Sequence, residues 1–280
     1  MLFSMKKRKK SRDIDVILTS SGVRAPVFVG ALTALEQKGY RIKRIAGTSG
    51  GAIIAAAYAL GKTTDEMLQL SKSVPYLSFR DFKFLNLFSL TNPSVYSGEG
   101  IDNYLKSLFG DARLKDFKID CKISVVTIVG RKRILLDKET YPELPVWQAV
   151  RMSSTIPFIF PYLKLEEIPV TDGGLDIRTD NIFPDRSHPV IVLRPRSDYS
   201  LKQETREFIP HKLFLWNYLK IIAEYLLDAV DLQHLEYNEW EKTIIIPTFS
   251  MGGFNFSIQP HEVENLVNFG YKAVSASDIV

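Results

Sequence analysis

Short runs of β-branched residues alternate with helical patterns along this chain, and this alternation restricts the fold more than any other feature. Strand patterns occur at 15–19, 41–47, 121–129, 133–136, 188–195 and 242–249. Helical patterns occur at 26–39, 52–61, 99–109, 145–153, 206–240 and 260–276. Strands separated by helices predict βαβ units, because a parallel connection must cross a face of the sheet. The expected fold class is α/β, a three-layer α/β/α sandwich with a mainly parallel central sheet.

Basic residues are concentrated at the N-terminus. The net charge is +4, and residues 6–12 carry six cations and no acid. Removing those six from +4 leaves a charge of about −2 on the rest, which argues against a nucleic-acid-binding surface. We expect a basic tail at 1–12, either a disordered solvated arm or a segment attracted to anionic lipid. No linker or repeat follows, so we expect a single domain at 13–280.

The sequence also contains signals that bear on compartment. No apolar run reaches the roughly 18 residues of a membrane span, and the basic segment is followed by two aspartates instead of a signal-peptide core. The chain has one cysteine. These features predict a cytoplasmic protein that is peripheral at a membrane, with secretion by a signal-free route as the alternative.

The stretch Ile45–Ala52 reads IAGTSGGA and surrounds one serine with glycines. A strand, a tight turn, a serine and a helix are the arrangement of a nucleophile elbow. There Gly47 and Gly51 let strand and helix approach closely, and Ser49 lies at the positive end of a helix dipole. A structural glycine turn is the alternative, whereas a phosphate-binding loop fits poorly because no Gly-Lys-Ser/Thr follows.

A serine nucleophile also requires a base and an oxyanion hole. The loop Ser20–Ala25, between a strand and a helix, has backbone N–H groups that could face an oxyanion, with Arg24 adding positive potential. For the base, the best candidate is Asp172, which ends a strand-like segment and is followed by Gly173 and Gly174. An ordinary βα turn and an ordinary Asp-Gly turn are the respective alternatives.

These three motifs, in this order, resemble the patatin-like phospholipase family. That family carries a glycine-rich loop with an arginine, then G-x-S-x-G, then Asp-Gly-Gly or Asp-Gly-Ala. Segments 114–128, 146–162 and 257–274 are also similar to parts of the family.

The resemblance implies a patatin-like fold and lipid acyl hydrolysis by a Ser–Asp dyad through an acyl-enzyme. By that likeness Ser49 attacks the ester carbonyl, and Asp172 accepts the serine proton and later protonates the leaving alcohol. The oxyanion would be held by the amides of Gly22, Val23, Arg24 and Gly50. We expect no metal or other cofactor, since no metal-site spacing occurs in the sequence.

Two other readings stay open, and one of them follows from a departure from the family loop. The family loop reads Gly-Gly-Gly-x-Arg-Gly, whereas this chain has Ser-Ser-Gly-Val-Arg-Ala at 20–25. A non-catalytic lipid-binding protein with the same fold is therefore one alternative. A Ser-His-Asp esterase of the α/β-hydrolase type is the other, with a histidine taken from His188, His211, His234 and His261.

The substrate expected from the resemblance is a phospholipid or another fatty-acyl ester. Residues 75–98 are dense in Phe, Tyr and Leu, with Arg80 and Lys83 interleaved. This apolar loop is either a flap that dips into an anionic membrane or a cap packed on the core. The lipid class and the acyl position are left open.

Overall fold

The computed structural model describes residues 12–83, 86, 89–176, 178–179, 181–197, 243–249, 251–253 and 255–278. All but one residue of the predicted basic tail lie outside the described residues, as does the predicted helix at 206–240.

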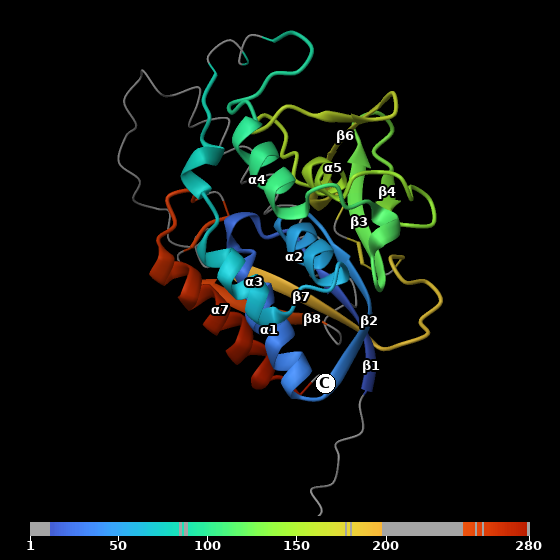
Figure 1. Ribbon diagram of the computed structural model, residues 1–280, viewed down its shortest axis with the longest axis vertical. Helices are drawn as coiled ribbons and strands as arrows, with labels where there is room; N and C mark the ends of the chain where they lie inside the picture. Colours follow the sequence, from blue (N-terminus) through green and yellow to red (C-terminus); the bar gives the residue numbers. More distant parts are fainter. Residues whose placement is uncertain are drawn as a thin grey trace, which may run out of the picture.

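The described strands form one eight-stranded sheet in the order β5-β6-β3-β2-β1-β7-β8, with β4 paired to β3 (Figure 1). Their bounds are β1 Arg12–Leu18, β2 Tyr40–Gly47, β3 Asp120–Thr127, β4 Arg133–Leu136, β5 Leu163–Leu165, β6 Ile168–Asp172, β7 Val190–Ser197 and β8 Thr243–Phe249. The pairings β3-β2, β2-β1, β1-β7 and β7-β8 are parallel. The predicted α/β class with a mainly parallel sheet is therefore confirmed, and the antiparallel strands β4, β5 and β6 extend it at the β3 end.

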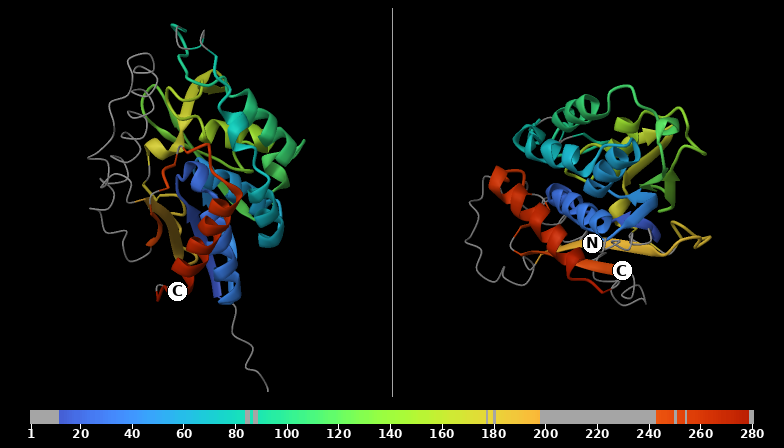
Figure 2. Two further views of the ribbon diagram at one scale, coloured as in Figure 1. Left: turned by 90° about the vertical axis from the view of Figure 1, so that its left-hand side faces the viewer. Right: turned by 60° about the horizontal axis from the view of Figure 1, so that its bottom comes forward.

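The described helices pack around a large core on one face of this sheet. Their bounds are α1 Pro26–Gln37, α2 Gly50–Ala59, α3 Thr64–Lys72, α4 Glu99–Phe109, α5 Val146–Ser153 and α7 Pro260–Ser275. Helices α1 and α7, distant in sequence, lie side by side (Figures 1 and 2). Within the described part of the chain, no helix has the length and apolar character needed to cross a membrane.

Strand β1 shows how the two faces of the sheet differ. Val16 and Leu18 face the helical core, because side chains alternate along a strand. Ile17 points to the opposite face and packs with Ile182 and Phe183 from the segment before β7. The chain is thus hydrophobic on both faces of its central strands, as expected for a buried parallel sheet.

Strands β2 and β6 meet end to end on one edge of β3. Ile123 pairs with Gly47 at the end of β2, and Val125 pairs with Asp172 at the end of β6. Both of these β3 residues also pair with β4, which must occupy the opposite edge. The last residues of β2 and β6 are therefore two positions, or roughly 7 Å, apart along β3. This register brings two distant parts of the sequence to one point.

Candidate active site

Ser49 occupies the turn between β2 and α2 and has a strained backbone. Its φ is 54° and its ψ is −126°, a region that non-glycine residues rarely adopt. The residue is 2% exposed. The glycines on either side are required by close approach: a Cβ on Gly47 would lie 2.6 Å from Ala52 Cα, and one on Gly51 would lie 2.5 Å from the Leu18 carbonyl oxygen. The predicted elbow geometry is present.

The end of β6 brings Asp172 to the elbow. Its side chain is fully buried. Its backbone N–H donates to the Thr155 carbonyl oxygen at 2.9 Å, and its Oδ1 accepts the Gly174 N–H at 2.7 Å. A Cβ on Gly173 would lie 2.2 Å from the Ser124 carbonyl oxygen, so the chain turns directly against β3. The Asp-Gly-Gly sequence is thus needed for the turn that holds the carboxylate in place.

The electrostatics of Asp172 are unusual for a carboxylate. Burial raises its pKa from 3.8 to about 7, against the lowering effects of the Gly174 N–H and the Ser49 hydroxyl. The hydroxyl is close enough to affect the pKa, yet Oδ2 has no well-formed hydrogen bond to any described residue. Loose geometry of this kind is common in unliganded sites. Ser49 and Asp172 therefore lie together, with one carboxylate oxygen open to accept a proton.

The loop before α1 forms a short 3-10 turn over Gly22–Arg24. Gly22 has a φ of +56°, whereas Ser21 and Ala25 have φ values of −141° and −46°. Only one of the family's loop glycines is thus required by the backbone here, and it is the one that this chain retains. A Cβ on Gly50 would lie 2.4 Å from the Gly22 carbonyl oxygen, so the loop and the elbow are in contact.

Fewer amides in this loop are free than the sequence predicts. The Val23 N–H donates to the Gly253 carbonyl oxygen at 2.9 Å, and the Arg24 N–H donates to the Ser21 carbonyl oxygen at 3.1 Å. The N–H groups of Gly22 and Gly50 have no acceptor among the described residues, because each begins a helical turn. The Arg24 side chain braces the loop by donating from Nε to the Ser21 carbonyl oxygen at 3.0 Å.

Ser153, at the end of α5, is a site residue that the sequence analysis does not identify. Its Oγ accepts the backbone N–H of Ser49 at 3.0 Å and donates to the Ser124 carbonyl oxygen at 2.6 Å. It is completely buried. In the sequence, the only indication of this residue is the stretch of small residues Ser153-Ser154-Thr155 within a segment similar to the family. Its spacing does not predict the contact with the Ser49 backbone.

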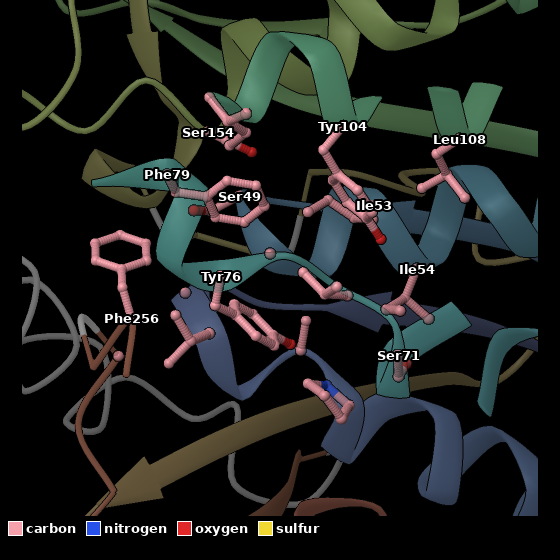
Figure 3. A pocket seen from close by; sticks show the side chains of 18 of the residues that line it. Ser49, Ile53, Ile54, Ser71, Tyr76, Phe79, Tyr104, Leu108, Ser154 and Phe256 are labelled. Carbon is pink, nitrogen blue, oxygen red and sulfur yellow. The ribbon is translucent and has the colours of Figure 1, made fainter. Parts of the chain in front are cut away.

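A largely apolar cavity begins at Ser49 and follows α2 (Figure 3). From the elbow it is lined by Ile53, Ile54 and Ala57, two helical turns or roughly 12 Å along α2. Tyr76 and Phe79 come from the turn η2, Tyr76–Phe79. Phe256, from the segment after β8, packs edge-on against Phe79 with ring centroids 6.3 Å apart. The cavity has the shape and surface that an acyl chain needs.

The apolar loop at 75–98 divides into a packed part and an exposed part. Phe79, Val95 and Tyr96 are buried. Leu77, Phe82 and Leu90 are exposed, and Leu90 completely so. Residues 84, 85, 87 and 88 lie outside the described residues.

The histidines do not accompany Asp172 in the described residues. His188 Nδ1 lies 3.2 Å from Asp15 Oδ1, and Asp15 is three residues before the end of β1. His261 is exposed in the first turn of α7. His211 and His234 lie outside the described residues. The described part of the chain also contains no cluster of three or more His, Cys, Asp or Glu side chains suited to a metal ion.

Comparisons with known proteins find related sequences and a similar fold. The profile of the family described as patatin-like phospholipase matches residues 16–182. An uncharacterized protein of Bacillus subtilis (strain 168), YqhO, is 29% identical over 283 residues, which cover 92% of this chain and 95% of YqhO. Lysophospholipase nte1 of Emericella nidulans is 28% identical over 170 residues, 60% of this chain but only 11% of that much longer protein. The crystal structure of VipD from Legionella pneumophila has a similar fold, with a TM-score of 0.59, 12% identity, and coverage of 93% of this chain and 66% of VipD.

Proposed function

This chain belongs to the patatin-like phospholipase family, and we propose that it hydrolyses fatty-acyl esters of lipids with Ser49 as nucleophile and Asp172 as base. The observation that supports this most is the Asp172 carboxyl group, which is buried beside Ser49 and leaves Oδ2 without a partner among the described residues. Its pKa of about 7 suits proton transfer at neutral pH, because a base is most effective when its pKa is near the working pH.

Acylation begins when Ser49 Oγ attacks the ester carbonyl carbon and its proton moves to Asp172 Oδ2. The tetrahedral intermediate carries a negative oxygen. When it collapses, the bond to the leaving alcohol breaks and Asp172 returns the proton to that alcohol. Water then attacks the acyl-serine in the same way, with Asp172 accepting the water proton and delivering it to Ser49 Oγ. One carboxyl group thus serves as base and acid in both halves of the reaction.

The oxyanion would be held by the Gly22 and Gly50 amides, a smaller set than the four predicted from the sequence. These two N–H groups are free among the described residues, whereas those of Val23 and Arg24 already have acceptors. Gly50 also begins α2, whose dipole favours negative charge at this point. Arg24 acts by bracing the loop rather than by contacting the substrate.

We propose a fatty-acyl ester of a membrane lipid as the substrate, with the acyl chain in the apolar cavity. The exposed side chains of Leu77, Phe82 and Leu90 would contact the membrane, and the basic tail at 1–12 would add attraction to anionic lipid. Sedimentation with vesicles of phosphatidylcholine, with and without phosphatidylglycerol, tests this contact. Leu90→Asp should lower vesicle binding and leave hydrolysis of a soluble short-chain ester unchanged, and equal binding by both forms would contradict the proposal.

The dyad is tested by covalent labelling together with a lipid panel. A fluorophosphonate probe should label the wild-type protein but not Ser49→Ala, while Ser73→Ala, an exposed serine on the same protein, should label normally. Release of fatty acid from phospholipid, lysophospholipid and monoacylglycerol should fall by about 10³-fold or more in Ser49→Ala and Asp172→Asn.

The same experiment, extended by replacing each of the four histidines with Ala, separates the two other readings. Lipid binding without labelling or turnover would identify a non-catalytic lipid-binding protein. A large loss on replacing a histidine, with Asp172→Asn benign, would identify a Ser-His-Asp esterase.

A further inference from the structure

Two tyrosine hydroxyl groups project into the cavity that starts at Ser49. Tyr76 comes from η2 and Tyr104 from α4, and both line the cavity. Figure 3 shows both rings extending into the space beside α2, with Tyr104 close to Ile53. Most of the other lining side chains are aliphatic or aromatic. A polar group at these two positions is therefore a local exception in an apolar surface.

Neither hydroxyl group has a hydrogen-bond partner among the described residues. The two cavity serines other than Ser49 behave differently: Ser71 Oγ donates to the Met67 carbonyl oxygen at 2.8 Å, and Ser154 Oγ donates to the Val150 carbonyl oxygen at 3.0 Å. Those serines are satisfied by their own helices and offer little to a ligand. The tyrosine hydroxyls remain available as donors and acceptors.

The surroundings hold the two rings in place and keep them neutral. The Phe79 ring packs against both, with its centroid 6.0 Å from that of the Tyr76 ring and 5.6 Å from that of the Tyr104 ring. Burial raises the pKa of Tyr104 to about 12 and that of Tyr76 further still. Both groups are therefore protonated at any working pH, and their positions are set by packing before a ligand arrives.

A purely hydrocarbon chain is poorly matched to this cavity. It would expel water from both hydroxyl groups and replace it with nothing that can hydrogen-bond, which is unfavourable for buried polar groups. An acyl chain with an oxygen-containing group partway along its length would form hydrogen bonds with both hydroxyl groups. Sites built to hydrogen-bond a substrate hydroxyl discriminate strongly against the analogue that lacks it.

We propose that this cavity is specific for hydroxylated fatty-acyl chains, whose hydroxyl group is bound by Tyr76 and Tyr104. The inference rests on the proposed function, because it takes Ser49 as the nucleophile and the cavity as the acyl site. It adds a substrate class that the apolar lining alone does not indicate.

The test compares 4-methylumbelliferyl stearate with a set of its chain-hydroxylated positional isomers. For the best isomer, the wild-type kcat/KM should exceed that for stearate by about tenfold or more. In the Tyr76→Phe/Tyr104→Phe double variant this ratio should fall to about one, chiefly because stearate is hydrolysed better and the hydroxylated ester less well. Tyr58→Phe is the matched control, since its hydroxyl donates to Glu36 outside the cavity; it should keep the wild-type ratio.

The inference is overturned if no isomer is preferred over stearate, or if the preference survives in the double variant. Hydrolysis of 4-methylumbelliferyl butyrate, a chain too short to need the tyrosines, separates this failure from failure of the dyad. If butyrate is hydrolysed in a Ser49-dependent way but stearate and its hydroxylated isomers have the same kcat/KM, only the inference is contradicted. If no ester is hydrolysed in a Ser49-dependent way, the proposed function is contradicted. Binding of free hydroxystearic and stearic acids to Ser49→Ala, measured by calorimetry, gives the same comparison without turnover, and equal affinities would also overturn the inference.

Discussion

Ser153 Oγ accepts the backbone N–H of Ser49 at 3.0 Å and so supports the strained residue of the elbow from the end of α5. The same oxygen donates to the Ser124 carbonyl oxygen at 2.6 Å, on the strand that also pairs with β6. One buried hydroxyl group therefore connects the turn that carries Ser49 to the strand that positions Asp172.

Ser153→Ala should lower kcat by about tenfold with little change in KM, because Ser49 loses the bond that holds its backbone at a φ of 54°. Steady-state kinetics on a soluble ester measures this. Ser94→Ala is the control, since Ser94 is equally buried and donates to the Tyr96 carbonyl oxygen. An equal kcat loss in both variants would mean that a general loss of stability explains the effect.

The pH dependence of hydrolysis should follow the ionisation of Asp172. The base must be ionised in the free enzyme, so kcat/KM should rise with pH to a plateau, with a midpoint at the Asp172 pKa of about 7. A pH–rate profile in a constant-ionic-strength buffer gives the midpoint. A midpoint near 4 would show that the carboxyl group is solvated in the working enzyme.

The same residue should limit stability at alkaline pH. Its folded pKa of about 7 exceeds the ordinary value of 3.8, so protonated Asp172 favours folding below pH 4 and this contribution is lost as pH rises through 7. The difference corresponds to about 4 kcal/mol. Asp172→Asn should therefore be more stable than wild type at pH 8, with the gap closing towards pH 4 in denaturant titrations. A gap that does not change with pH would contradict this.

The oxyanion loop should be sensitive to substitution at Gly22 and tolerant of it at Ser21. Gly22→Ala places a side chain at a φ of +56° and within 2.1 Å of the Gly253 carbonyl oxygen, so we expect a loss of about 10²-fold or more in kcat. Ser21→Gly restores a family glycine where φ is already −141°, and should change kcat less than threefold. Kinetics and circular dichroism of both variants test this. A large gain in Ser21→Gly would show that the serine impairs the loop.

The ion pair between the buried Arg151 and the partly exposed Asp102, beside the site, should contribute to folding. Arg151 is 1% exposed and its Nε donates to Asp102 at 2.6 Å, while its Nη1 donates to Thr155, next to the Asp172 backbone. Asp102→Asn removes the nearest counter-charge of a buried guanidinium and leaves Asp81 as the other carboxylate that acts on it, so it should lower the free energy of unfolding by about 2 kcal/mol. Glu99→Gln, which removes an exposed partner of Lys83, should change it by less than about 1 kcal/mol. Urea titrations compare the two.

Local sequence patterns were sufficient to predict most of the helices and strands. Helix α4 has the predicted bounds of 99–109, and β4 has those of 133–136. Helix α3 is absent from the prediction because the stretch Thr64–Lys72 is largely polar and its apolar face is narrow. The sequence feature that indicates this helix is the capping box, in which the side chains of Thr63 and Glu66 each accept a hydrogen bond from the other's backbone N–H.

Sequence alone determined the elbow at Ser49 and the turn after Asp172, because tight backbone geometry requires particular residues at fixed short spacings. Only the tertiary structure decided that these two points meet. Gly47 and Asp172 are separated by more than a hundred residues, and their neighbouring positions on β3 follow from strand register, which depends on the packing of the whole sheet. The bond from Ser49 to Ser153 and the occupied amides of Val23 and Arg24 have the same origin. So do the hydroxyl groups of Tyr76 and Tyr104, which have no partner in the described part of the chain. Each depends on which distant group lies opposite, and no spacing along a chain specifies that.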